Sequence, residues 1–250
     1  MARLRAAGCV FAEEEAALLR EAGDPSLVDR RCAGEPLEHL LGWVAFAGLR
    51  LAVGPGVFVP RRRTELMARE AIALRPGLLV ELCCGVAPVA AAVEAALPEV
   101  VTWASDIDPV AVSFATRNTR GTAVVGDLDD ALPASLAGRV DVIACNAPYV
   151  PTDELPSLPP EARDHEPHHA LDGGDDGLSL VRRAADRAPR WLRPGGALLV
   201  EVSEHQVPAA VAIFQAAGLE ARVARDDSGT VLVGVSTAEI ADPAREVGRS

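Results

Sequence analysis

Lysine is absent from the sequence: all 24 basic residues among its 250 are arginines, set against 36 acidic residues. The uniform use of arginine indicates a compositional bias, and we attach no chemistry to it. The net charge of −12 argues against binding of nucleic acid over a broad surface, because phosphate binding needs a basic surface. The run Arg61-Arg62-Arg63 is the one local basic candidate, and a solvated turn explains it equally well.

Long apolar runs are missing as well, because no stretch approaches the roughly 18 residues of a membrane span. The N-terminus lacks the shape of a signal peptide, so we expect a cytoplasmic protein. Five scattered cysteines, two of them adjacent at Cys83 and Cys84, fit neither a disulfide framework nor a CxxC metal pair. They predict reduced thiols. His165, His168 and His169 have no further ligands at metal-binding spacing, and we predict no metal site.

The apolar pattern divides the chain into four parts. We expect a short helical region over 1–42, a β-hairpin linker over 43–63, a main domain over 64–236 and a disordered tail over 237–250. In the main domain, helices alternate with apolar runs of buried-strand type at 78–82, 100–105, 123–125, 140–145 and 197–202. Two further runs, 219–225 and 230–236, predict a closing antiparallel pair. This pattern predicts an α/β fold with a doubly wound, mostly parallel sheet of seven strands and an antiparallel last strand.

Ligands of such sheets bind at the carboxyl ends of the strands. The first loop, residues 81–87, contains Gly85, which lets the backbone approach a ligand closely before a helix begins at Pro88. Asp106 and Asp127 directly follow later strands, where carboxylates can accept from a ribose cis-diol and from an adenine amino group. Each aspartate alone is also explained as a helix cap. Together they favour a nucleoside-containing cofactor.

The loop after the strand 140–145 reads Asn146-Ala147-Pro148-Tyr149. An amide nitrogen is a poor nucleophile because its lone pair is delocalised into the carbonyl. Two acceptors, the Asn146 side-chain carbonyl and the Ala147 backbone carbonyl, would fix both N–H bonds and aim the lone pair at a methyl sulfonium. Pro148 would stiffen the turn and Tyr149 would pack on the planar amide. An ordinary strand-ending turn explains the loop in isolation just as well.

In this order the loops resemble the glutamine-N5 protein methyltransferases that modify peptide chain release factors and a ribosomal protein. The likeness runs from about Glu35 to Val235. It rests on residues 35–42 (EPLEHLLG), 58–65 (FVPRRRTE), 146–149 (NAPY) and 166–178 (EPHHALDGGDDGL). The last stretch is the most specific, because no turn or helix rule would generate it.

The resemblance implies a class I fold dependent on S-adenosyl-L-methionine, with S-adenosyl-L-homocysteine as product. Its implied catalytic positions are Asn146, Ala147, Pro148 and Tyr149. The implied cofactor-binding positions are Glu81, Cys83, Cys84, Gly85, Val86, Ala87, Asp106, Ile107, Asp127, Leu128 and Asn146. The implied substrate-binding positions are Phe58, Pro60, Arg61, Glu65, Asn146, Pro148, Tyr149 and Glu166. The implied partner is a protein that presents a glutamine, such as a release factor; neither a membrane nor nucleic acid is expected.

The sequence departs from the family at three places. Cys83 and Ala87 replace glycines of the first loop, and we expect their side chains to crowd a cofactor. Ala147 replaces the first proline of Asn-Pro-Pro-Tyr but keeps its carbonyl. The helical region before the hairpin is short for the family, which indicates a paralogue with a different target. Three alternatives therefore stay open: a small-molecule N-methyltransferase of specialised metabolism, a nucleic-acid amino methyltransferase, and a catalytically impaired paralogue.

Overall fold

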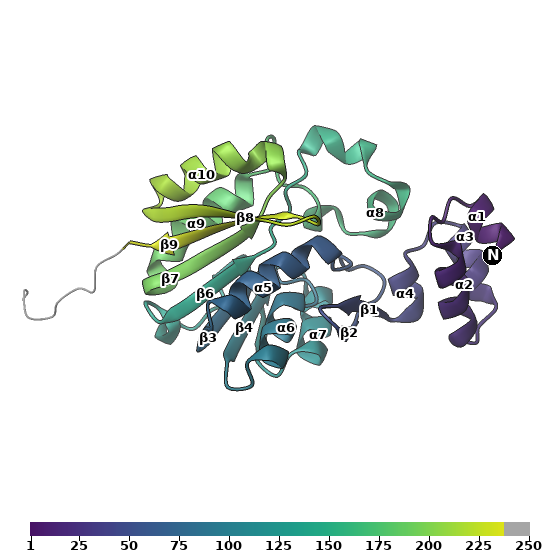
Figure 1. Cartoon of the computed structure of the whole chain (residues 1–250), viewed down its shortest axis with the longest axis horizontal. Coiled ribbons are helices and arrows are strands. Elements are labelled where there is room, and N and C mark those ends of the chain that lie inside the picture. The colour runs from purple at the N-terminus through teal and green to yellow at the C-terminus, as the bar shows by residue number, and fades with distance from the viewer. Residues whose placement is uncertain (238–250) are drawn as a thin grey trace, which may run out of the picture.

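A seven-stranded sheet forms the centre of the computed structural model, which describes residues 1–237 (Figure 1). The strand order is β5-β4-β3-β6-β7-β9-β8. Neighbours are parallel from β5 to β7, whereas β9 runs antiparallel to both β7 and β8. The bounds are β3 (Leu78–Leu82), β4 (Val101–Asp106), β5 (Thr122–Val125), β6 (Val140–Cys145), β7 (Leu192–Glu201), β8 (Leu219–Arg225) and β9 (Thr230–Ser236). The predicted fold class is confirmed.

Helices cover both faces of this sheet, because successive side chains of a buried strand point to opposite sides. In β3, Leu79 packs into one apolar cluster and Val80 into the other. The first cluster includes residues of α5 (Glu65–Ala73), α6 (Pro88–Ala96) and α7 (Pro109–Asn118). The second includes residues of α9 (Ser179–Trp191) and α10 (Val207–Ala216).

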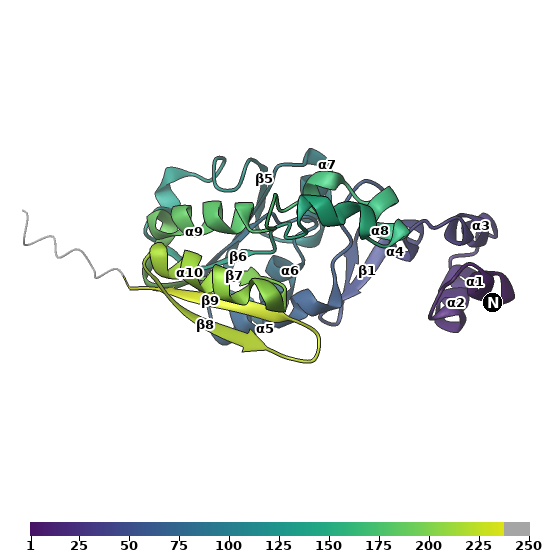
Figure 2. The same cartoon turned by 90° about the horizontal axis from the view of Figure 1, so that it is seen from above.

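The N-terminal helices form a separate small unit that stands away from the sheet (Figures 1 and 2). It consists of α1 (Ala2–Ala6), α2 (Ala12–Glu21) and α3 (Ser26–Cys32), with α4 (Leu37–Leu41) leading towards the hairpin. Its core is its own: Leu4, Ala12, Ala16, Leu19 and Leu27. Arg31 joins the unit to the main domain, because its guanidinium pairs with the buried Glu15 of α2 and with Glu161 of the main domain.

The hairpin pairs β1 (Trp43–Phe46) with β2 (Leu49–Ala52). Its two-residue turn places Ala47 and Gly48 at φ 48° and 78°, the left-handed conformation that tight hairpins need. Residues 57–59, which follow the hairpin, do not form a strand. Val59 donates its N–H to the Glu166 carboxylate instead of to a neighbouring strand.

The stretch 193–196 belongs to β7, where Gly196 passes so close to β6 that a Cβ would lie 2.8 Å from the Val140 carbonyl oxygen. The stretch 150–176 contains η3 (Thr152–Ser157), α8 (Pro160–His165) and η4 (His168–Ala170). Other short turns are η1 (Arg62–Thr64), η2 (Ala134–Leu136) and η5 (Glu204–Gln206).

Two expectations concern membranes and the chain end. Within residues 1–237, no helix has the length and apolar character needed to cross a membrane. The tail expected to be disordered lies outside the described residues, apart from Thr237.

Candidate active site

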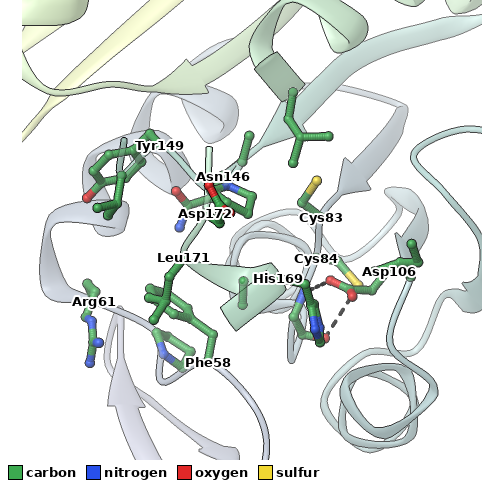
Figure 3. A pocket seen from close by; sticks show the side chains of 18 of the residues that line it. Phe58, Arg61, Cys83, Cys84, Asp106, Asn146, Tyr149, His169, Leu171 and Asp172 are labelled. Carbon is green, nitrogen blue, oxygen red and sulfur yellow. Dashed lines mark hydrogen bonds between the residues drawn. The ribbon is translucent and has the colours of Figure 1, made fainter. Parts of the chain in front are cut away.

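A cavity of about 760 Å³ opens at the carboxyl ends of the parallel strands (Figure 3). One wall is made by the loops that follow β3, β4, β5 and β6, and the opposite wall by the segment between η3 and η4. Most of the predicted site residues lie on it: Phe58, Pro60, Arg61, Glu81, Cys83, Cys84, Gly85, Val86, Asp106, Ile107, Asp127, Leu128, Asn146, Ala147, Pro148 and Tyr149.

The loop after β3 turns by alternating left-handed residues. Cys83, Gly85 and Ala87 have φ of 49°, 53° and 58°. This conformation costs a residue with a Cβ roughly 1–2 kcal/mol, so two of the three positions are strained. A Cβ built on Gly85 would meet nothing within 4 Å, because this glycine borders open space. Ala87 does not line the cavity; its methyl group is fully buried in the core.

Cys83 and Cys84 are the two cysteines of this loop, and both line the cavity. A hydrogen bond to Cys145 and burial raise the pKa of Cys83, and burial raises the pKa of Cys84. Both therefore stay neutral thiols, the unreactive form. All five cysteines are free. These facts favour a packing role for the pair over oxidation sensing.

Asp106 ends β4 and accepts two backbone hydrogen bonds. The Gly85 N–H donates to one carboxylate oxygen at 2.8 Å and the Asp108 N–H to the other at 2.9 Å. The cap of α7 is Asp108, which accepts from the Val110 N–H, so the capping explanation does not apply to Asp106. Burial raises the pKa of Asp106. Its carboxyl group is held beside the first loop, on the cavity wall (Figure 3).

Glu81 is buried beneath the same loop. Its two carboxyl oxygens accept from the N–H groups of Val89 and Ala90 in the first turn of α6. Burial raises the pKa of Glu81 to about 8. Asp127 differs in that it is half exposed and pairs with Arg183 of α9 at 2.7 Å. Ile107 is 58% exposed, so an apolar side chain stands beside these acids without a packing partner of its own.

The loop 146–149 continues directly from β6. The Asn146 Nδ2 donates to the Thr64 hydroxyl at 3.3 Å. Tyr149, the only tyrosine of the chain, lies with its ring centroid 5.1 Å from the Arg63 guanidinium carbon. Its backbone carbonyl accepts from the Gln206 side chain at 3.0 Å. The loop is thus held by side chains from two distant segments of the chain, Thr64 of η1 and Gln206 of η5.

The glycine-rich part of the stretch 166–178 has a structural reason. A Cβ on Gly177 would lie 2.1 Å from the Tyr149 carbonyl oxygen, and a Cβ on Gly173 would lie 2.7 Å from the Gly177 backbone. Gly177 also has φ 72°. These glycines therefore let the chain pass directly behind the Asn146–Tyr149 loop and support it.

Two predicted substrate-binding residues lie off the cavity wall. Glu65 accepts from the Ala47 N–H at the hairpin turn. Glu166 is buried behind the wall, where it accepts from the Val59 N–H and the Arg61 guanidinium. Glu166 thereby fastens the 150–178 segment to the hairpin linker. Its role is to hold the wall in place.

Sequence reasoning missed much of the second wall. Leu158, Pro159, Glu161, Ala162 and the residues 169–172 line the cavity. His169, expected as an ordinary loop histidine, lies with Nε2 3.7 Å from the Asp108 carboxylate. The sequence feature that pointed to this wall was the stretch 166–178, because its residue pattern is more specific than a surface loop requires. Among residues 1–237, no group of metal-ligating side chains comes together.

Solved structures with the same fold are methyltransferases. A methyltransferase from Pyrococcus furiosus superposes with a TM-score of 0.56 at 17% identity, over 76% of this chain and 90% of that one. The catalytic domain of hMettl16 superposes with a TM-score of 0.57 at 12% identity, over 77% of both chains. The chain therefore has the fold of the class I methyltransferases.

Sequence comparison identifies the family to which this chain belongs. The release factor glutamine methyltransferase of Geobacter sulfurreducens is 37% identical over 211 residues, 81% of this chain and 73% of that protein. The protein of the same name from Mycolicibacterium smegmatis is 42% identical over 183 residues, although the alignment spans only 64% of its length. This chain belongs to the release factor glutamine methyltransferase family, which confirms the resemblance. No protein-family model matches it.

A relative named for a different activity is about equally similar. The 4-amino-L-phenylalanine/4-methylamino-L-phenylalanine methyltransferase of Streptomyces pristinaespiralis is 38% identical over 203 residues, 76% of this chain and 69% of that protein. This chain is thus also similar to a protein named for a small aromatic amine.

Proposed function

We propose that this chain transfers a methyl group from S-adenosyl-L-methionine to the side-chain amide nitrogen of a glutamine in another protein, such as a peptide chain release factor. The observation that carries the proposal is the Asn146–Tyr149 loop, which shares one cavity with Asp106 in a chain of this family. The acidic net charge and the names of the relatives support a protein substrate over nucleic acid.

The cavity suits this cofactor. Gly85 leaves open space beside the first loop, and Asp106 holds a carboxyl group where a ribose diol would donate to it. When bound, the cofactor supplies an electrophilic methyl group. We assign the methionine side to the cavity-lining residues of the first loop: Glu81, Cys83, Cys84, Gly85 and Val86. We assign the adenine side to Ile107, Asp127 and Leu128.

The chain's own contribution is orientation. The Asn146 side-chain carbonyl and the Ala147 backbone carbonyl accept the two N–H groups of the target amide. The lone pair of the nitrogen then turns out of the amide plane and points at the methyl group as the nitrogen pyramidalises. Tyr149 packs against the planar amide. One amide proton leaves to solvent after transfer, and no side chain has to titrate.

Calorimetric titration tests the cofactor part. Asp106→Ala should weaken S-adenosyl-L-methionine binding about ten- to hundredfold, because a hydrogen bond to a charged group contributes roughly 1.5–3 kcal/mol. Asp108→Ala is the matched control: it removes a neighbouring carboxylate that caps α7 and should leave affinity within about threefold. Equal losses in both variants would contradict the assignment of Asp106.

Methyl transfer to protein tests the substrate part. Purified release factor and cofactor with an isotopically labelled methyl group are incubated with the enzyme, and the labelled peptide is sequenced by mass spectrometry. The expected result is one methyl group on a glutamine side chain. Label on no polypeptide would refute the proposed substrate class.

A second candidate is methylation of a small aromatic amine, favoured by the Streptomyces pristinaespiralis relative. An aromatic amine also presents two N–H bonds, and Phe58, Leu158 and Leu171 give the cavity apolar walls for a ring. The same labelling assay, run with 4-amino-L-phenylalanine in place of release factor, separates the two. Label in the amino acid alone would move this candidate to first place.

A further inference from the structure

Four side chains from distant parts of the sequence meet at the end of β6: Arg63, Thr64, Asn146 and Glu201. The strands β6 and β7 are parallel and in register, with Cys145 opposite Val200. The next residue on each strand, Asn146 and Glu201, therefore comes out at the same edge of the sheet. Thr64, the last residue of η1 and the residue before α5, lies against both of them.

These residues form one chain of hydrogen bonds. Arg63 Nε donates to one oxygen of Glu201 at 2.8 Å, and the Thr64 hydroxyl donates to the other at 2.7 Å. The Asn146 Nδ2 donates to the Thr64 Oγ1 at 3.3 Å. Thr64 and Glu201 are almost completely buried, with 0% and 1% of their surface exposed. Such a network has little room to rearrange.

The direction of each hydrogen bond follows from the number of protons that each group can donate. An ionised carboxylate only accepts hydrogen bonds. Burial raises the pKa of Glu201, whereas the hydrogen bond from the Thr64 hydroxyl and the Arg63 guanidinium, 2.8 Å away, favour its ionised form. The single hydroxyl proton of Thr64 is therefore used on Glu201, and its oxygen can only accept from Asn146. The Asn146 amide must present its NH₂ group to Thr64, which turns its carbonyl oxygen to the other side.

We propose that Thr64 and Glu201 are positioning residues: they select the one orientation of the Asn146 amide whose carbonyl oxygen faces the target nitrogen. This inference rests on the proposed N-methylation and adds what sets the acceptor. Without the Thr64 hydroxyl, the amide is free to turn over, and in the inverted form its NH₂ group would repel the N–H bonds of the substrate. The proposed function assigns the cofactor to the loops after β3, β4 and β5, so its affinity should not change with the orientation of the Asn146 amide.

Three variants test the proposal. Thr64→Val removes the hydroxyl at constant shape and should lower kcat by about a hundredfold, the effect of a misplaced reacting group, while the cofactor Kd stays unchanged. Thr64→Ser restores the hydroxyl and should recover most of kcat. Thr102→Val is the matched control, because Thr102 is equally buried and its hydroxyl also donates to a buried glutamate, Glu94. It should lose stability and keep kcat.

A spectroscopic readout is independent of the substrate. The sequence contains only two asparagines, Asn118 and Asn146, so protein labelled with ¹⁵N at asparagine gives two side-chain NH₂ signals. The Asn146 pair should be protected from solvent exchange in the wild type and in Thr64→Ser, and should lose this protection in Thr64→Val.

The two readouts separate the two hypotheses. Unchanged protection in Thr64→Val, or unchanged kcat with an active wild type, would overturn the positioning role. Lost protection in Thr64→Val together with a wild type inactive on every amide and amine would support the fixed orientation and refute the proposed function instead.

Discussion

The left-handed backbone at Ala87 leads to a quantitative prediction about stability. Ala87 has φ 58° and caps α6, whereas Ala92 lies within the same helix; both are buried. Changing either residue to glycine removes one buried methyl group, about 0.8 kcal/mol, and raises the entropy of the unfolded chain by a similar amount. Only Ala87→Gly also relieves the left-handed strain of roughly 1–2 kcal/mol.

We therefore expect Ala92→Gly to lower the free energy of unfolding by about 2 kcal/mol and Ala87→Gly to change it by less than about 1 kcal/mol. Urea denaturation followed by circular dichroism measures both. Since Ala87 does not line the cavity, its variant should also bind S-adenosyl-L-methionine like the wild type. Equal losses of stability in the two variants would mean that the left-handed residue carries no strain.

Three further predictions follow from contacts around the cavity. Gly177→Ala should push the Tyr149 carbonyl away, because its Cβ would lie 2.1 Å from that oxygen, and should reduce kcat more than tenfold while calorimetry shows unchanged cofactor affinity. In urea titrations, the Glu81→Gln variant should become more stable relative to the wild type as the pH rises from about 5 to 8. The reason is that a carboxyl whose pKa is raised to about 8 on folding stabilises the wild type at low pH, and this contribution is lost as the pH rises. A constant difference across that range would contradict the raised pKa. Arg31→Met should destabilise the N-terminal unit by roughly 3 kcal/mol, because it leaves Glu15 buried without its ion-pair partner. Adding Glu15→Leu to the same chain should recover most of this stability. Hydrogen-exchange protection of α2 measures both effects.

The sheet could be predicted because its signal is local. Most strands of the main domain contain a short apolar run bounded by turn residues, and β8 and β9 begin and end where the pattern placed them. The sites at strand ends followed from this, since parallel strands bring their carboxyl ends to one edge. Asp106 and Asn146 were accessible to sequence reasoning for that reason.

The second wall could not be predicted in the same way. The helix α8 has six residues and buries none of them, so it has no apolar periodicity to detect. The chain from Arg63 through Thr64 and Glu201 to Asn146 joins residues up to 138 positions apart. Nothing in the local sequence marks these residues as partners. The left-handed backbone conformation of Cys83 could not be predicted either, because a cysteine side chain does not indicate that conformation.

One consequence of the single tyrosine concerns observation of the working enzyme. Tyr149 lies on the cavity wall with its ring over the Arg63 guanidinium, and the chain has no second tyrosine. Protein that carries ¹³C-labelled tyrosine would therefore give a ring spectrum that comes from this site alone. Displacement of the guanidinium, or arrival of a substrate on the ring, would change the ring-current surroundings of that one signal. The occupancy of the cavity and the rate of turnover could thus be followed in solution without any attached probe.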